Sequence, residues 1–172
     1  MDLRNVVEDA MGGFESMAKK IPGYSGYKEK EQRREADALL REHLARELET
    51  QWARSNDLRS QMLIGPAMSQ LDDMGKASRR LQTLIDKIKA AAQGYAGFFD
   101  AVKVKEDQLD ALYEFDNDML LRVDDIADAI DAVQAALDSE ENVAPSARRL
   151  NTVISELLTL FDKRKDVVTG LY

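Results

Sequence analysis

The sequence predicts an all-α protein built from long amphipathic helices. Only three prolines and nine glycines occur among 172 residues, too few for the many turns of a β protein. Charged residues make up 33% of the chain and hydrophobic residues 44%, which is typical of helices that bury one stripe and solvate the rest. Apolar residues recur at steps of three and four along most of the chain. These observations favour an up-down antiparallel four-helix bundle, or an extended coiled coil, preceded by an N-terminal amphipathic helix.

The N-terminal helix is expected over residues 1–21. Its apolar residues fall on one face, and Pro22 ends it because proline disfavours the helical conformation of the residue before it. Residues 22–26 contain two glycines and form the expected linker. The bundle is expected over the remaining residues, 27–172.

Four bundle helices are expected, over residues 27–64, 67–101, 106–138 and 146–169. Gly65-Pro66 marks the first stop, since glycine suits a helix C-terminus and proline the first turn of the next helix. The second of these helices has the most regular heptad pattern, with nine of ten a and d positions able to bury. These positions are Leu71, Ser78, Ile85, Ala92 and Phe99, alternating with Met74, Leu81, Ile88, Tyr95 and Val102.

One segment carries a resemblance. The stretch from Ile21-Pro22-Gly23-Tyr24 to Asp37 resembles a bacterial all-helical family to which no activity is attached, and the resemblance continues weakly over residues 94–100. It implies a bacterial origin. The order of a leading amphipathic helix and a long hairpin is also similar to that of phage-shock membrane-remodelling proteins, in architecture alone.

Composition restricts the partners and the location. The chain has no cysteine, which excludes disulfides and thiolate metal sites and fits a reducing cytosol, so we expect a cytoplasmic protein. The net charge is −8, and residues 105–142 alone carry −11. Because no basic stripe is present to neutralise phosphates, nucleic acid is not expected as a partner.

The acidic helix over residues 106–138 suggests a divalent metal site, as in a metal-dependent helical hydrolase. The heptad positions of the aspartates argue against such a site. With Leu109 and Val123 at position a, the aspartates fall at b, c and f and point away from the buried face, which indicates a solvated acidic face. They are Asp118, Asp124, Asp125, Asp128 and Asp131.

Asp116 differs because it occupies an a position within an otherwise apolar face. A buried carboxylate is costly without a partner, so the sequence predicts either a structural, register-setting pair or a small polar site. If the helices are straight and antiparallel, the only histidine, His43, lies near the level of Asp116. The polar site would then comprise Asp116, His43, Tyr95 and Tyr113.

The N-terminal helix is the second candidate for function. Phe14, Met17 and Ile21, with Lys19 and Lys20, form a face that suits the chain's own bundle, a membrane surface or a partner subunit. Most often, the apolar face of such a helix packs against the rest of its own chain. Residues 1–21 have more acidic than basic side chains, which weakens attraction to anionic lipid.

The motifs of known helical and nucleophilic enzymes are missing from the sequence. Di-iron bundles need two Glu-x-x-His motifs, but the residue three before His43 is Leu40. No phosphate-binding Gly-x-x-x-x-Gly-Lys loop occurs. We therefore expect no catalysis, no cofactor and no metal.

These patterns favour a non-catalytic interaction or scaffold protein that self-associates or binds a protein partner. The charged helix over residues 27–64 is the expected contact surface, and Trp52 is its candidate anchor. The alternative is a peripheral membrane protein that binds lipid through residues 1–21. A metal-dependent helical hydrolase is the third hypothesis.

Overall fold

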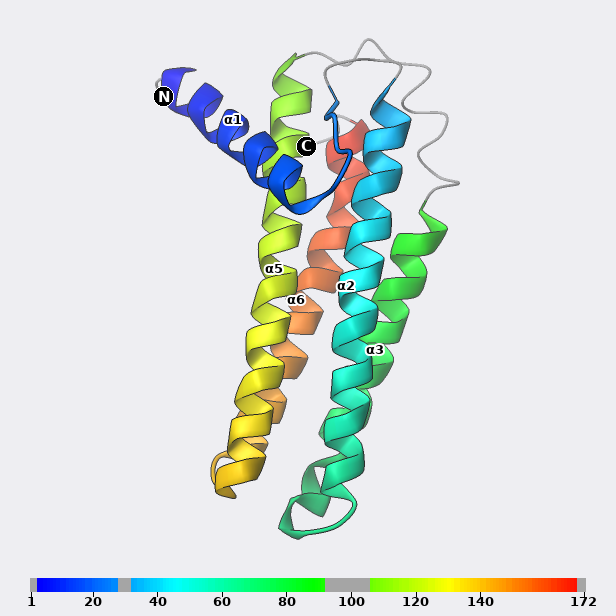
Figure 1. The fold of residues 1–172 in the computed structure, drawn as a ribbon, viewed down its shortest axis with the longest axis vertical. Helices are drawn as coiled ribbons and strands as arrows, with labels where there is room; N and C mark the ends of the chain where they lie inside the picture. Colours follow the sequence, from blue (N-terminus) through cyan, green and yellow to red (C-terminus); the bar gives the residue numbers. More distant parts are fainter. Residues whose placement is uncertain (1–2, 28–31, 92–105, 170–172) are drawn as a thin grey trace.

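The computed structural model describes residues 3–27, 32–91 and 106–169, and in these ranges it is all-helical, as predicted, with no β-strand (Figure 1). Five α-helices pack against one another, and one short 3₁₀ helix joins two of them. The elements are α1 (Leu3–Lys20), α2 (Arg33–Met62), η2 (Pro66–Gln70), α3 (Leu71–Ala90), α5 (Glu106–Ser139) and α6 (Val143–Thr169).

The helices α2, α3, α5 and α6 lie along the long axis of the molecule, and α1 lies against α5 at one end (Figure 1). The most extensive contacts are between α5 and α6 and between α2 and α3, and further contacts join α3 to α6 and α2 to α5. The four long helices therefore enclose one core. None of the helices in the described ranges is long and apolar enough to cross a membrane.

The core follows the heptad pattern. Residues Met74, Leu81 and Ile88 of α3 are at most 1% exposed, and they pack in the same cluster as Ile126 and Val133 of α5. The predicted a and d positions Ala92, Tyr95, Phe99 and Val102 lie outside the described residues.

Helix α2 contributes polar as well as apolar residues to the core. Ser55 is fully buried, and its hydroxyl shares a hydrogen bond of 3.2 Å with that of Ser78 on α3. The side chain of Gln51 is also buried and accepts a hydrogen bond of 2.8 Å from Arg54. These bonds compensate the loss of water around each polar group, which explains how a helix with a diluted apolar stripe still packs.

The structure begins α2 at Arg33, whereas the sequence analysis began this helix at residue 27. Tyr27 is fully buried and lies in the connector between α1 and α2. Its backbone N–H donates to Tyr113 Oη, and its carbonyl oxygen accepts a bond of 2.6 Å from Arg33 Nε. The carbonyl group that a helix starting at this residue would use is thus bound by a side chain instead. Residues 28–31 lie outside the described ranges.

Two other helix starts differ from expectation. Pro66 opens the 3₁₀ helix η2 before α3 begins at Leu71, and Gly65 takes the φ of +140° that this abrupt turn requires. Helix α6 begins at Val143 and includes Pro145. Proline is tolerated there because N–H groups in the first turn of a helix have no partner within the helix.

Candidate functional site

Asp116, singled out by its place in the heptad, lies at the centre of a buried polar cluster. Its side chain is completely buried, and both of its oxygens accept hydrogen bonds from protein groups. Arg164 Nε of α6 lies 2.8 Å from Asp116 Oδ1, and Arg164 Nη2 lies 3.1 Å from Oδ2. The Tyr27 hydroxyl donates a bond of 2.6 Å to Oδ2. We call these residues, with Asp37, the polar cluster.

Asp37 on α2 extends the cluster to a third helix. Arg164 Nη1 forms an ion pair of 2.8 Å with Asp37 Oδ1, and Arg41 Nε donates a bond of 2.8 Å to Asp37 Oδ2. Two carboxylates therefore meet two guanidinium groups, so the charges balance. Balanced and hydrogen-bonded charges are the form in which a core tolerates ions.

Burial and the charges of the cluster together shift the pKa values of its members. Burial raises the pKa of Asp116 above its ordinary value, and the attraction of Arg164 opposes this rise. Burial also raises the pKa of Tyr27 far above its ordinary value, and the negative charge of Asp116 adds to the shift. Burial alone would lower the pKa of Arg164, but the two carboxylates raise it well above its usual range. Tyr27 therefore stays protonated and donates its hydrogen bond at physiological pH.

An aromatic group attaches the connector to the cluster. The ring of Tyr27 packs on Tyr24 with centroids 6.0 Å apart and on Tyr113 at 5.2 Å. Phe14 of α1 packs edge-on against Tyr113 at 5.7 Å. Aromatic rings at these separations add about 0.5–1.5 kcal/mol per pair beyond simple burial. The connector is thus fixed to α5 and α6 by both polar and aromatic contacts.

The cluster leaves little room for a ligand. Every oxygen of Asp116 is occupied by a protein donor, and the side chains of Asp116, Tyr27 and Arg164 are all fully buried. Its arrangement joins helices and orients the connector. Within the described parts of the chain, no group of three or more acidic, histidine or cysteine side chains is placed to hold a metal ion.

The structure brings only some of the predicted site residues together. Tyr113 borders the cluster through its bond from the Tyr27 backbone. His43 is half-buried and lies elsewhere on α2, with its Nδ1 3.2 Å from Arg46. It lines a shallow groove of about 230 Å³ with Lys20 and Asp124. The predicted member Tyr95 lies outside the described residues.

Three members of the cluster were not predicted from the sequence: Tyr27, Asp37 and Arg164. Arg164 had a detectable pattern, because it interrupts the apolar stripe of the last helix as Asp116 interrupts that of the previous one. Opposite charges at buried positions of neighbouring antiparallel helices are natural partners. Tyr27 had no such pattern, since it lies in the non-helical connector.

The apolar side chains at the C-terminal end of α1 and at the following residue pack against the chain's own core. Met17 is 0% exposed and Ile21 2%, and Phe14 is partly buried against the same cluster. Lys19 is exposed, and Lys20 forms an ion pair of 2.6 Å with Asp124 of α5.

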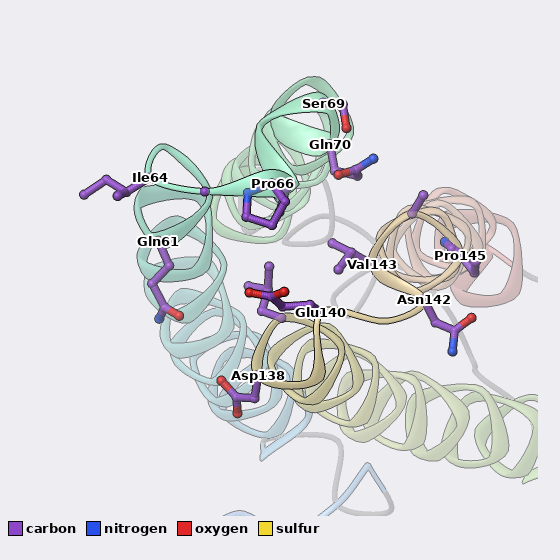
Figure 2. Close-up of a pocket in the computed structure, with 14 residues that line it drawn as sticks. Gln61, Ile64, Pro66, Ser69, Gln70, Asp138, Glu140, Asn142, Val143 and Pro145 are labelled. Atoms are coloured by element: carbon purple, nitrogen blue, oxygen red, sulfur yellow. The ribbon is translucent and has the colours of Figure 1, made fainter.

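A second candidate site lies where the turn between α2 and α3 meets the turn between α5 and α6. The two turns border an open groove of about 570 Å³, which we call the hairpin groove (Figure 2). Its lining includes Pro66, Leu137 and Val143 as apolar surface and Asp138 and Glu140 as charges. In Figure 2, Gln61 and Asp138 lie on one side of the hollow, and Asn142 and Pro145 lie on the other.

Large exposed apolar side chains gather beside this groove. Leu63 is 57% exposed, Ile64 89% and Met68 57%. All three belong to the turn between α2 and α3, and Ile64 also lines the groove. We call Leu63, Ile64 and Met68 the hairpin patch. Trp52, the predicted anchor on α2, is 36% exposed.

Comparisons with protein-family models, with curated proteins and with solved structures gave no match.

Proposed function

We propose that this chain is a non-catalytic helical module that binds a protein partner through its hairpin patch. The observation that carries the proposal is the exposure of Leu63, Ile64 and Met68 on a single turn. Large apolar surface left exposed to water typically marks a site of interaction with another protein. Burying one such side chain fully contributes about 1.5–3 kcal/mol, so three of them supply a useful share of a binding energy.

The rest of the molecule suits the role of a rigid support. We propose an up-down antiparallel four-helix bundle of α2, α3, α5 and α6, with α1 as an appended amphipathic helix. Contacts of α2 with α5 and of α3 with α6, in addition to those within each hairpin, favour a compact bundle over an extended rod. The polar cluster ties α2, α5, α6 and the connector together. The hairpin turns would then be presented on a stiff base.

The hairpin patch is a better candidate surface than the centre of α2. Trp52 has already buried about two thirds of its area, whereas Ile64 has buried almost none. A partner that covers Ile64 and its neighbours therefore removes more apolar surface from water. Trp52 remains a secondary anchor in this proposal.

Lipid binding through α1 is a weaker alternative. Met17 and Ile21, which would have to enter the lipid, are buried in the chain's own core. Freeing them would break the aromatic contacts of Phe14 and the ion pair between Lys20 and Asp124. Without such a rearrangement, the protein should not sediment with vesicles.

The proposal is tested by comparing what copurifies with the protein from cells of its own source. The test variant carries Leu63→Ser and Ile64→Ser, and the matched control carries Leu121→Ser, which alters a leucine of 49% exposure on α5. We expect a partner, identified by mass spectrometry, to be lost with the test variant and retained with the control. If both variants retain every partner of the wild type, the hairpin patch is not the binding surface.

A further inference from the structure

The hairpin groove has an uneven charge. Fourteen residues line it, and among them Asp138 and Glu140 are acidic while none is basic. Both acidic side chains are exposed, and Glu141 is exposed next to them. A ligand that enters this groove therefore meets negative charge on one wall and the apolar side chains of Pro66 and Val143 on others.

Glu140 is held at the groove by an unusual backbone. Its φ is +57°, a left-handed conformation that is unfavourable for a residue with a side chain and favourable for glycine. Two hydrogen bonds fix this turn at the end of α5: Glu140 N–H to the Leu137 carbonyl at 3.2 Å and Glu141 N–H to the Ala136 carbonyl at 3.1 Å. Glycine is the usual residue at this point of such a turn. A strained residue at a surface groove is a typical feature of a functional position.

We propose that the hairpin groove binds a cationic amphipathic helix of a partner protein. The apolar face of that helix would cover Val143 and Pro66, and its lysine or arginine side chains would pair with Asp138 and Glu140. This inference rests on the proposed function, because the groove adjoins the hairpin patch, and it adds the chemistry of the partner. Complementary charge sets the register and the encounter rate of such complexes, while apolar burial supplies the affinity.

A second copy of the chain suits this groove less well than a cationic partner does. In a symmetric dimer the same patch faces itself, which would bring Asp138 and Glu140 of both copies together. Like charges placed opposite each other oppose association. The acidic lining therefore favours a different protein over self-association at this end of the bundle.

The inference is tested by titrating the full chain with two synthetic helical peptides. One has leucine on one face and lysine on the other, and the second has glutamate in place of each lysine. We expect the lysine peptide to bind, with an affinity that falls as salt is added, and the glutamate peptide to bind at least about tenfold more weakly.

Two charge-reversed variants show where the peptide binds. The test variant, Asp138→Lys with Glu140→Lys, should bind the lysine peptide about tenfold more weakly than the wild type. The control, Glu114→Lys with Asp128→Lys, makes the same change in net charge at two exposed positions of α5 outside the groove. We expect its affinity to stay within about twofold of the wild type, because surface charges beyond a Debye length are largely screened.

Three results would overturn the inference: equal binding of both peptides, no binding of the lysine peptide, or equal weakening by the two variants. If the free protein forms a dimer and the hairpin-patch variant Leu63→Ser/Ile64→Ser does not, a second copy of the chain is the occupant of the groove. That result would also overturn the inference. The proposed function has a separate test. If a partner is lost with that variant in cells while the lysine peptide fails to bind, the interaction module stands and the cationic partner is wrong.

Discussion

Arg164 of α6 donates two hydrogen bonds to Asp116 of α5, from Nε to Oδ1 at 2.8 Å and from Nη2 to Oδ2 at 3.1 Å, and both side chains are completely buried. The pair is bidentate, the geometry in which arginine binds a carboxylate most strongly. It joins α6 to α5 and, through the Tyr27 hydroxyl, to the connector that follows α1.

Breaking this pair from one side should be costly. The single substitution Asp116→Leu leaves Arg164 buried with Asp37 as its remaining ion-pair partner, so we expect a loss of about 3–5 kcal/mol in the free energy of unfolding. Adding Arg164→Met removes the excess buried positive charge that Asp116→Leu creates, and should restore most of the loss. Urea denaturation measures both. The control Arg122→Met alters a partly exposed arginine and should change stability by less than about 0.5 kcal/mol. An Asp116→Leu variant as stable as the wild type would contradict this view of the cluster.

Two glycines should respond to alanine in opposite directions. Gly26 has a φ of +80°, and a Cβ there would collide with Tyr113 Oη and lie 2.8 Å from Phe14 Cε2, so Gly26→Ala should destabilise by about 1–3 kcal/mol. Gly12 lies within α1 with no atom near its missing Cβ, so Gly12→Ala should stabilise by up to about 1 kcal/mol. Thermal unfolding followed by circular dichroism compares the two. A Gly26→Ala protein that melts like the wild type would show that the connector is not packed as described.

His43 should make stability depend on pH. Burial lowers its pKa below the ordinary value, so between that lowered pKa and about 6.5 the unfolded chain binds more protons than the folded one. The contribution of His43 to the free energy of unfolding is fully present above about pH 6.5, and it is lost as the pH falls through the pKa of His43 in the folded protein. His43 is the only histidine, so the difference in urea midpoint between the wild type and His43→Gln isolates its effect. A difference that is the same at about pH 7.5 and pH 5 would contradict the lowered pKa.

The strained turn at the end of α5 should be improved by glycine. Glu140→Gly relieves the positive φ while keeping the two backbone bonds of the turn, so we expect a gain of about 1 kcal/mol in the free energy of unfolding. The matched variant Glu140→Ala removes the carboxylate without relieving φ and should not stabilise. We expect both variants to bind the lysine peptide more weakly, although only Glu140→Gly is more stable than the wild type. That result would show that the Glu140 carboxylate contributes to binding while its backbone conformation lowers stability.

The all-helical fold and much of its core could be predicted because helical periodicity is a local property. Met74, Leu81 and Ile88 were expected to be buried from their spacing alone, and they are. The start of α2 was not predictable in the same way. The charged run after residue 27 favours a helix locally, but Tyr27 is held outside it by Tyr113 and Arg33.

The candidate sites were predicted less completely than the fold. Asp116 was predicted to belong to a site because an acidic residue at a buried heptad position needs a partner. Its partner was predicted to be His43, which would lie at the same height along straight, antiparallel helices. The structure supplies Arg164 and Tyr27 instead. The hairpin patch was not predicted, because Leu63 and Ile64 were placed inside the helix expected over residues 27–64, whereas α2 ends at Met62 and leaves both side chains exposed in the turn.

The central claim, that the hairpin patch contacts a protein partner, is tested most directly by photo-crosslinking in living cells. A photoreactive amino acid replaces Ile64 in one variant and Leu121, on the outer side of α5, in the other. We expect a discrete crosslinked product from position 64, with the partner identified by mass spectrometry, and no such product from position 121. The claim would be contradicted by a discrete product from position 121 alone, or by the absence of a discrete product from both positions.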